Sequence, residues 1–145
     1  MSELGLERAN EIIAQALAKA REMGIPPVTV VVLDASGHLK AAQREDGASM
    51  FRFDVALGKA WAAVAMGVPS RTLAERARDN PNFFVALAAT GNGKFLPQPG
   101  AVLIRNGSGR VIGAAGASGG TGDEDEALCA HGVETAGLRA DPRPA

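Results

Sequence analysis

The residues best suited to chemistry are a charged loop and one isolated lysine that follows it. Arg44 to Gly47 ends a predicted strand in a charged, glycine-containing loop, and Arg52 comes shortly after it. Lys59 stands on a segment that is otherwise almost wholly apolar, and a charge buried there without a partner is costly. Two interpretations stay open. Lys59 forms a structural ion pair with Asp46 or Asp125, or the arginines and Lys59 form an anion clamp.

A glycine-rich stretch, residues 113–122, joins a predicted strand to the last predicted helix and holds five glycines. Free N–H groups at a helix start attract anions, but the acidic run 123–126 already complements that helix dipole. We interpret the acidic run as a solvated helix start, so the sequence predicts no phosphate-binding loop. The glycines either make a tight turn with close packing, or Gly113 and Gly116 admit a flat ligand to the strand.

The two histidines are isolated from other metal-binding residues. His38 begins a predicted strand and His131 lies in the last helix, and neither has a second ligand at helical spacing. The sequence therefore predicts no zinc site. Haem needs only one protein ligand on one side, so His38 and His131 are candidates for that role, with Met50 and Met66 as alternatives. His38 and Lys59 are also the candidates for a general base.

Composition excludes several classes of partner. The 145 residues carry a net charge of −1, and the basic residues are scattered, so no field attracts nucleic acid. No apolar run approaches the ~20 residues that span a bilayer, and no export signal precedes the first helix. The single cysteine, Cys129, fits a reducing compartment. We therefore expect a cytoplasmic protein with no membrane and no nucleic-acid partner.

Hydrophobic periodicity and turn residues predict an α+β layered domain. Two hairpins build an antiparallel sheet, and helices flank it. The helix over 54–66 has little polar surface, so it lies either at the centre of the domain or against another subunit. We expect a single domain over residues 1–138 and a disordered tail over residues 139–145. The predicted elements are helix 6–23, strands 28–33 and 38–44, helix 54–66, short helices on either side of Asn80-Pro81, strands 101–105 and 110–117, and helix 122–138.

The order and spacing of several motifs resemble the GlcG/HbpS family, the haem-binding or haem-degrading-like domain also found at the C-terminus of PduO-type corrinoid adenosyltransferases. The resemblance covers roughly residues 5–138. The motifs are Val31–Leu39, Arg44–Ala48, Gly58-Lys59-Ala60, Pro99-Gly100, Val111–Gly120 and Asp125-Glu126.

This resemblance implies a profilin-like layered fold that assembles into homo-oligomers. It also implies a small-molecule ligand, since some relatives bind haem or a corrinoid and others accompany catabolic operons. The recurrent family positions in this chain are Asp34, Gly37, Arg44, Asp46, Gly47, Lys59, Gly113, Gly116, Ser118, Gly119 and Asp125.

Three hypotheses follow. The first is an oligomeric protein that binds haem or another tetrapyrrole between the 44–47 loop, Lys59 and the glycine-rich stretch. The second is a cytoplasmic enzyme acting on a small organic acid, with Lys59 or His38 as base and Arg44 as carboxylate anchor. The third is a structural or regulatory assembly with no ligand. For the first, the expected ligand-binding residues are Arg44, Asp46, Gly47, Arg52, Lys59, Gly116, Ser118, Gly119 and Asp125.

Overall fold

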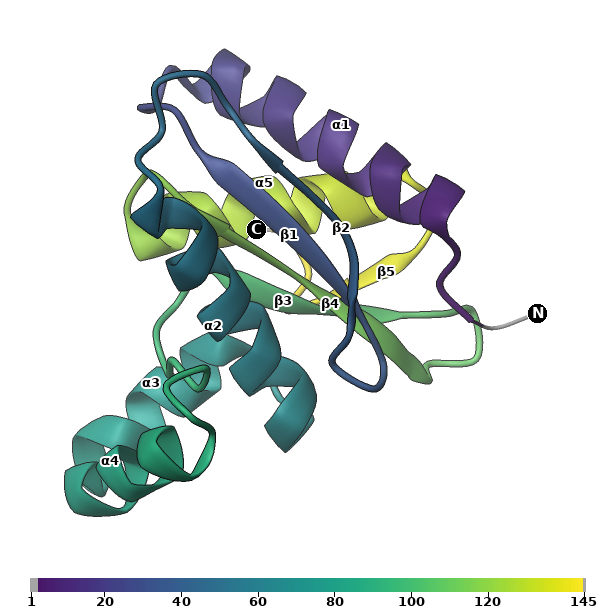
Figure 1. Ribbon diagram of the computed structural model, residues 1–145. Helices are drawn as coiled ribbons and strands as arrows, with labels where there is room; N and C mark the ends of the chain where they lie inside the picture. Colours follow the sequence, from purple (N-terminus) through teal and green to yellow (C-terminus); the bar gives the residue numbers. More distant parts are fainter. Residues whose placement is uncertain (1–2, 145) are drawn as a thin grey trace.

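A computed structural model describes residues 3–144 as a layered α+β fold, with helices on both faces of one antiparallel sheet (Figure 1). The α+β class and the sheet built from two hairpins are confirmed. The elements are α1 Leu6–Met23, β1 Thr29–Asp34, β2 Leu39–Arg44, α2 Phe51–Met66, α3 Ser70–Asp79, α4 Pro81–Thr90, β3 Ala101–Arg105, β4 Val111–Ser118, α5 Gly122–Thr135 and β5 Arg139–Asp141.

The sheet has the strand order β2-β1-β4-β3-β5. The hairpins β1–β2 and β3–β4 join through an antiparallel pairing of β1 with β4. Local hydrogen bonds make the first turn, since Asp34 Oδ1 accepts the backbone N–H groups of Ser36 and His38 at 2.9 and 3.0 Å. Gly37 adopts φ 82° in this turn, a conformation that glycine reaches without steric cost.

The fifth strand corrects the predicted tail. The sequence predicts disorder from Arg139 onward, but Arg139–Asp141 pair with β3 at the edge of the sheet. Asp141 accepts from the Arg105 guanidinium at 2.9 Å. Glu134 accepts the backbone N–H of Ala140 at 2.8 Å. Long-range partners therefore order a segment that lacks any local signal, while Ala145 lies outside the described residues.

Alternation along β1 divides the core between two layers. Val30 and Val32 belong to the cluster with α1 and α5, whereas Val31 and Leu33 belong to the cluster with α2. Side chains of a strand alternate between the two faces, so a fully buried β1 needs cover on both. Figure 1 shows α1 and α5 on one face of the sheet and α2 on the other. Helix α2 is thus central to the domain, one of the two positions predicted for it.

Helices α3 and α4 extend away from the sheet beyond α2 (Figure 1). A small cluster of Ala62, Leu73, Phe84 and Phe95 holds them to the rest of the chain. Helix α4 contains no charged residue, yet Phe84 is its one buried side chain. Val85 is 70% exposed on it. This helix therefore presents an apolar face that the chain itself leaves uncovered.

Close approach of α2 to β4 requires glycine at position 116. A Cβ atom built there would lie 2.5 Å from the carbonyl oxygen of Ala56 and 3.1 Å from the Cβ of Ala60. Both contacts come from α2, whose backbone therefore packs directly on the strand. Of the two interpretations of the glycine-rich stretch, the geometry at Gly116 supports close packing.

We expect Gly116→Ala to destabilise the protein by about 1–3 kcal/mol, because α2 must move away from the sheet. The matched control is Gly107→Ala in the β3–β4 turn, where an added Cβ meets nothing within 4 Å. The control should change the free energy of unfolding by no more than about 0.5 kcal/mol. Urea unfolding measures both, and equal effects would contradict the packing argument.

Candidate ligand-binding site

A pocket of about 420 Å³ lies where β4 ends and leads into α5. Three parts of the chain build it: one face of α2, the connection before β3, and the glycine-rich elbow after β4. Its lining mixes apolar and polar side chains with backbone. The lining residues are Arg52, Val55, Lys59, Leu96, Gln98, Pro99, Ser118, Gly120, Thr121, Gly122, Asp123 and Asp125.

A buried ion pair forms the floor of this pocket. Lys59 Nζ lies 3.1 Å from Asp125 Oδ2, and their side chains are only 7% and 1% exposed. The same ammonium donates to the Ala117 carbonyl at 3.0 Å. Asp125 Oδ1 accepts the Gly120 N–H at 2.9 Å. Of the interpretations left open for Lys59, the structure therefore supports the structural ion pair, and the partner is Asp125 rather than Asp46.

Burial raises the pKa of the Asp125 carboxyl above its ordinary value, although Lys59 and the Gly120 N–H oppose that shift. The carboxylate thus depends on these two partners to stay charged away from water. The ion pair with Asp125 supports the structural interpretation of Lys59. Its roles as a general base or in an anion clamp stay predictions.

Glycine 100 makes room for the lysine. It adopts φ 135°, and a Cβ there would lie 2.5 Å from Lys59 Nζ. The side chain of Lys59 therefore passes directly over this backbone to reach α5. Only glycine allows both the conformation and the approach.

The acidic start of α5 is structural rather than solvated. Thr121 and Glu124 form a reciprocal capping box, which satisfies two N–H groups at the helix start. Arg71 on α3 contacts Asp123, and its Nε lies 3.1 Å from Glu126 Oε2. Only Asp123 remains exposed as the prediction of a solvated start required, since Asp125 is buried and Glu124 and Glu126 are half-buried. The capping box at Thr121 has a sequence signature that was missed.

Arg52 supplies the free cation of the pocket. Its Nη1 donates to Ser118 Oγ at 3.1 Å, and the residue is exposed in the first turn of α2. Ser118 is buried at the end of β4. Both predicted residues therefore line one pocket together with Lys59 and Asp125.

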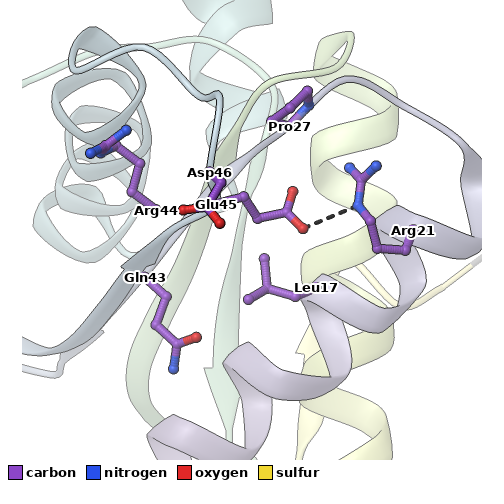
Figure 2. A pocket seen from close by; sticks show the side chains of 7 residues that line it. All are labelled: Leu17, Arg21, Pro27, Gln43, Arg44, Glu45 and Asp46. Carbon is purple, nitrogen blue, oxygen red and sulfur yellow. Dashed lines mark ion pairs between the residues drawn. The ribbon is translucent and has the colours of Figure 1, made fainter.

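The loop at 44–47 lines a different pocket, of about 410 Å³ (Figure 2). Asp46 lies there beside Glu45, whose Oε2 is 3.1 Å from Arg21 Nε. Gly47 is a turn residue with φ 88° packed against Pro27. Arg44, Asp46 and Gly47 are therefore not among the residues that line the pocket of Lys59, and their role in ligand binding stays a prediction.

The glycines Gly116 and Gly119 do not admit a ligand. The Cβ position of Gly116 is filled by α2, and that of Gly119 lies 2.4 Å from Val28 Cγ1 and 2.6 Å from the Pro27 carbonyl. Both therefore serve packing within the chain. Neither is among the residues that line the pocket, and their role in ligand binding stays a prediction.

The histidines lie away from the pocket. β1 pairs with β4 from Thr29–Ser118 to Asp34–Gly113. His38 follows Asp34 and so belongs to the opposite end of the sheet. His131 on α5 contacts Thr135 at 3.4 Å. Within residues 3–144, no group of three His, Cys, Asp or Glu side chains is placed to hold a metal ion. Neither histidine lines the candidate site as base or axial ligand.

Cys129 is fully buried on α5, and burial raises the pKa of its thiol above the ordinary value. A protonated thiol is a poor nucleophile, and this cysteine belongs to the core. Over the part of the chain that the structure describes, no helix is both long and apolar enough to cross a membrane.

These observations define a class: a layered α+β domain with an amphipathic pocket at one end of its sheet. The chain belongs to the HbpS-like family, whose model, described as haem degrading protein HbpS-like, matches residues 4–134. The family resemblance seen in the sequence is therefore confirmed.

Individual relatives share the whole architecture. An uncharacterized 15.0 kDa protein from the dhaT-dhaS intergenic region of Citrobacter freundii is 33% identical over 118 residues, which is 80% of each chain. The Klebsiella pneumoniae protein ORFY is 25% identical with a TM-score of 0.83, covering 92% of this chain and 90% of that one. A double mutant of HbpS from Streptomyces reticuli is 27% identical with a TM-score of 0.79, covering 93% and 88%. A PduOC:heme complex, at 24% identity and a TM-score of 0.82 with 94% and 96% coverage, shares the fold.

We expect Lys59→Met to destabilise the protein by about 3–5 kcal/mol, because the Asp125 carboxylate is left buried without a partner. The double variant Lys59→Met, Asp125→Asn should recover most of that loss, since no uncompensated charge remains. Lys94→Met, at an exposed lysine, is the matched control and should have little effect. Denaturant unfolding measures the free energy of unfolding of each variant. A double variant no more stable than Lys59→Met would refute the ion-pair explanation.

Proposed function

We propose that this protein binds a tetrapyrrole, with haem as the first candidate, in the 420 Å³ pocket beside α2. The observation that carries the proposal is the pairing of an apolar wall with one free guanidinium. Val55, Leu96 and Pro99 give the wall, and Arg52 gives the charge. A tetrapyrrole such as haem has a flat apolar body and carboxylates at one edge, which suits such a lining.

Exposed apolar side chains extend this wall to the outside. Phe51 is 64% exposed at the start of α2. It precedes Val55 by four residues, so the two side chains are neighbours on the helix surface. Met50, just before the helix, is also exposed. Solvent-exposed aromatic and thioether groups beside a pocket are the contacts that an apolar macrocycle would cover.

The family supports the same ligand. The chain belongs to the HbpS-like family, which is described as haem degrading, and the structural relative PduOC is described in complex with haem. The hypothesis of an enzyme that acts on a small organic acid is weaker. Of its two proposed bases, Lys59 is ion-paired with Asp125, and His38 lies at the other end of the sheet from the pocket.

The lining contains no His, Met, Cys or Tyr among the described residues, so shape and charge must hold the ligand. We therefore expect metal-free protoporphyrin to bind as tightly as haem, within about threefold, in absorbance and fluorescence titrations. A corrinoid, whose side chains are amides rather than carboxylates, should bind at least tenfold more weakly, an order of magnitude that one charge-assisted hydrogen bond supplies.

Arg52→Ala should weaken porphyrin binding by about tenfold or more. Arg78→Ala on α3, also at an exposed arginine, is the matched control and should bind like the unaltered protein. Binding of haem without binding of metal-free porphyrin would mean that an axial ligand from elsewhere dominates. Absence of saturable binding by either compound would refute the proposal.

We further propose that the protein self-associates through α4. The helix has no charged residue, and its exposed Phe83 lines an apolar pocket of about 350 Å³ that also contains Met66. Val85 is exposed on the same helix. Because the helix carries no charge, its exposed face can pack against the same face of a second copy without needing a partner of opposite charge. Arg76 and Asp79, which also line that pocket, are of opposite sign, so a twofold contact can pair the arginine of each copy with the aspartate of the other.

Val85→Lys should shift the protein toward the monomer, because a charge enters a desolvated apolar contact. Sedimentation or light scattering across a concentration series measures the shift. Glu75→Lys, at an exposed position on α3, controls for added positive charge alone. If the unaltered protein is monomeric at all concentrations, the proposed self-association through α4 is refuted.

A further inference from the structure

The sheet has an open edge at β2. This strand is the last one on its side of the order β2-β1-β4-β3-β5, so within residues 3–144 only β1 pairs with it (Figure 1). An edge strand presents unpaired N–H and C=O groups to other chains, and proteins usually blunt it with proline, lysine or a bulge. β2 contains no proline, and its bulge lies at Lys40, near the β1–β2 turn. The stretch from 41 to 44 is therefore open.

The register of β1 with β2 identifies which backbone groups face outward. The Glu45 N–H donates to the Val28 carbonyl at 3.0 Å, and hydrogen-bonded and non-hydrogen-bonded pairs alternate along an antiparallel ladder. Arg44, opposite Thr29, is the next residue of the ladder, and Ala42 lies two residues further on. Both therefore fall at non-hydrogen-bonded pairs, where the N–H and C=O groups point away from β1.

The side chains along this edge leave room for another strand. Ala41 and Ala42 are small, and Gln43 and Arg44 are exposed. A pocket of about 410 Å³ lies beside the edge, and both of these exposed residues line it. In Figure 2 their side chains point away from each other, as expected for neighbours on one strand. No bulky group therefore covers the outward backbone of Ala42.

Three charges at this edge have no partner within the chain. Lys40, Arg44 and Asp46 form no ion pair in the part of the chain that the structure describes. Lys40 lies at one end of the open stretch, and Asp46 lies just beyond the other end. The edge thus carries opposite charges at its two ends, and such a pattern is complementary to itself when a second copy runs antiparallel.

The charges also select the register of such a contact, because like charges directly opposite each other on neighbouring strands are destabilising. A twofold axis at Ala42 sets Arg44 opposite Lys40, and an axis at Arg44 sets two arginines opposite each other. An axis at Gln43 instead sets Arg44 opposite Ala42. The same register brings Lys40 of each copy level with Asp46 of the other.

We propose that β2 is a self-recognition edge, at which two copies of this chain pair antiparallel about a twofold axis at Gln43 and join their sheets. Ala42 and Arg44 of each copy exchange backbone hydrogen bonds with the other, and Lys40 pairs with Asp46 at both ends. Such a contact is isologous, so one pattern serves both copies. An unrelated strand meets the same backbone but must supply matching charges at the same spacing. The surface is separate from α4, which extends away from the sheet beyond α2 (Figure 1), so this inference rests neither on the α4 contact nor on the tetrapyrrole.

The first test reverses the charges. Lys40→Glu and Asp46→Lys should each weaken self-association at least tenfold in sedimentation equilibrium, because like charges then face each other at both ends of the contact. The two single variants, when mixed, should associate with each other to within about threefold of the unaltered protein, since the introduced glutamate of one faces the introduced lysine of the other. The double variant should recover equally. Arg139→Glu, on the opposite edge strand β5, is the matched control for the change of charge.

A failure of this test is distinguishable from failure of the α4 contact. If Lys40→Glu and Asp46→Lys associate like the unaltered protein while Val85→Lys does not, the edge proposal is overturned and the α4 proposal stands. Mixed single variants that stay monomeric also overturn the register proposed for the edge.

The second test traps the register. Gln43→Cys should form a disulfide-linked dimer on mild oxidation, because the Cα atoms of residues directly opposite each other at a non-hydrogen-bonded pair are roughly 4.5 Å apart, a separation that a disulfide spans. Ala41→Cys is the matched control and should remain unlinked, since it lies opposite Glu45 in this register. The native Cys129 is fully buried. Faster linkage of Ala42→Cys than of Gln43→Cys overturns the register.

Amide exchange tests the backbone pairing residue by residue. The N–H groups of Ala42 and Arg44 should exchange at least tenfold faster after dilution to the monomer, whereas those of Ala41 and Gln43, which bond β1 in both states, should stay slow. Val85→Lys should leave this pattern unchanged. Exchange at Ala42 and Arg44 that ignores protein concentration overturns the edge contact and leaves the tetrapyrrole proposal intact. Slowing by poly-glutamate instead of by protein concentration assigns the edge to an acidic strand and overturns self-pairing.

Discussion

The ion pair between Lys59 and Asp125 is the interaction on which the rest of the structure depends. Helix α2 lies on one face of the sheet and α5 belongs to the layer on the other, and the lysine reaches from the first to the second at the end of β4. A pair so deeply buried gains little over an apolar substitute, but it fixes position. Lys59 passes over Gly100, and Asp125 accepts the Gly120 N–H. The ion pair therefore fixes the position of α2 relative to α5.

Small residues on β4 make that geometry accessible. With Gly116 facing α2 and alanines at 114, 115 and 117, the strand lets helix backbones approach to contact distance. The same strand then ends in Ser118, at the mouth of the pocket. Packing and site are therefore not separate features, because the close helix approach is what brings Arg52 and Val55 of α2 to the end of the sheet.

The sequence predicted what depends on local patterns and missed what depends on distant partners. Alternating and apolar runs identified both hairpins, and the predicted helix over 6–23 matches α1. The edge strand at 139–141 has no pattern of its own and is ordered by Arg105 and Glu134. For the site, an isolated lysine on an apolar helix pointed correctly to an ion pair. Residue type alone, however, could not reveal that Gly116 and Gly119 face the backbone.

The pocket draws its walls from both layers and from the connection between them. The unfolded chain has no such arrangement, so any molecule that fills the pocket binds the native state alone. Its binding energy is then added to the stability of the fold in proportion to the logarithm of its concentration. Degradation of a marginally stable protein follows the population of its open form. If the proposed ligand fills this pocket, the lifetime of the chain would therefore rise with the supply of that ligand.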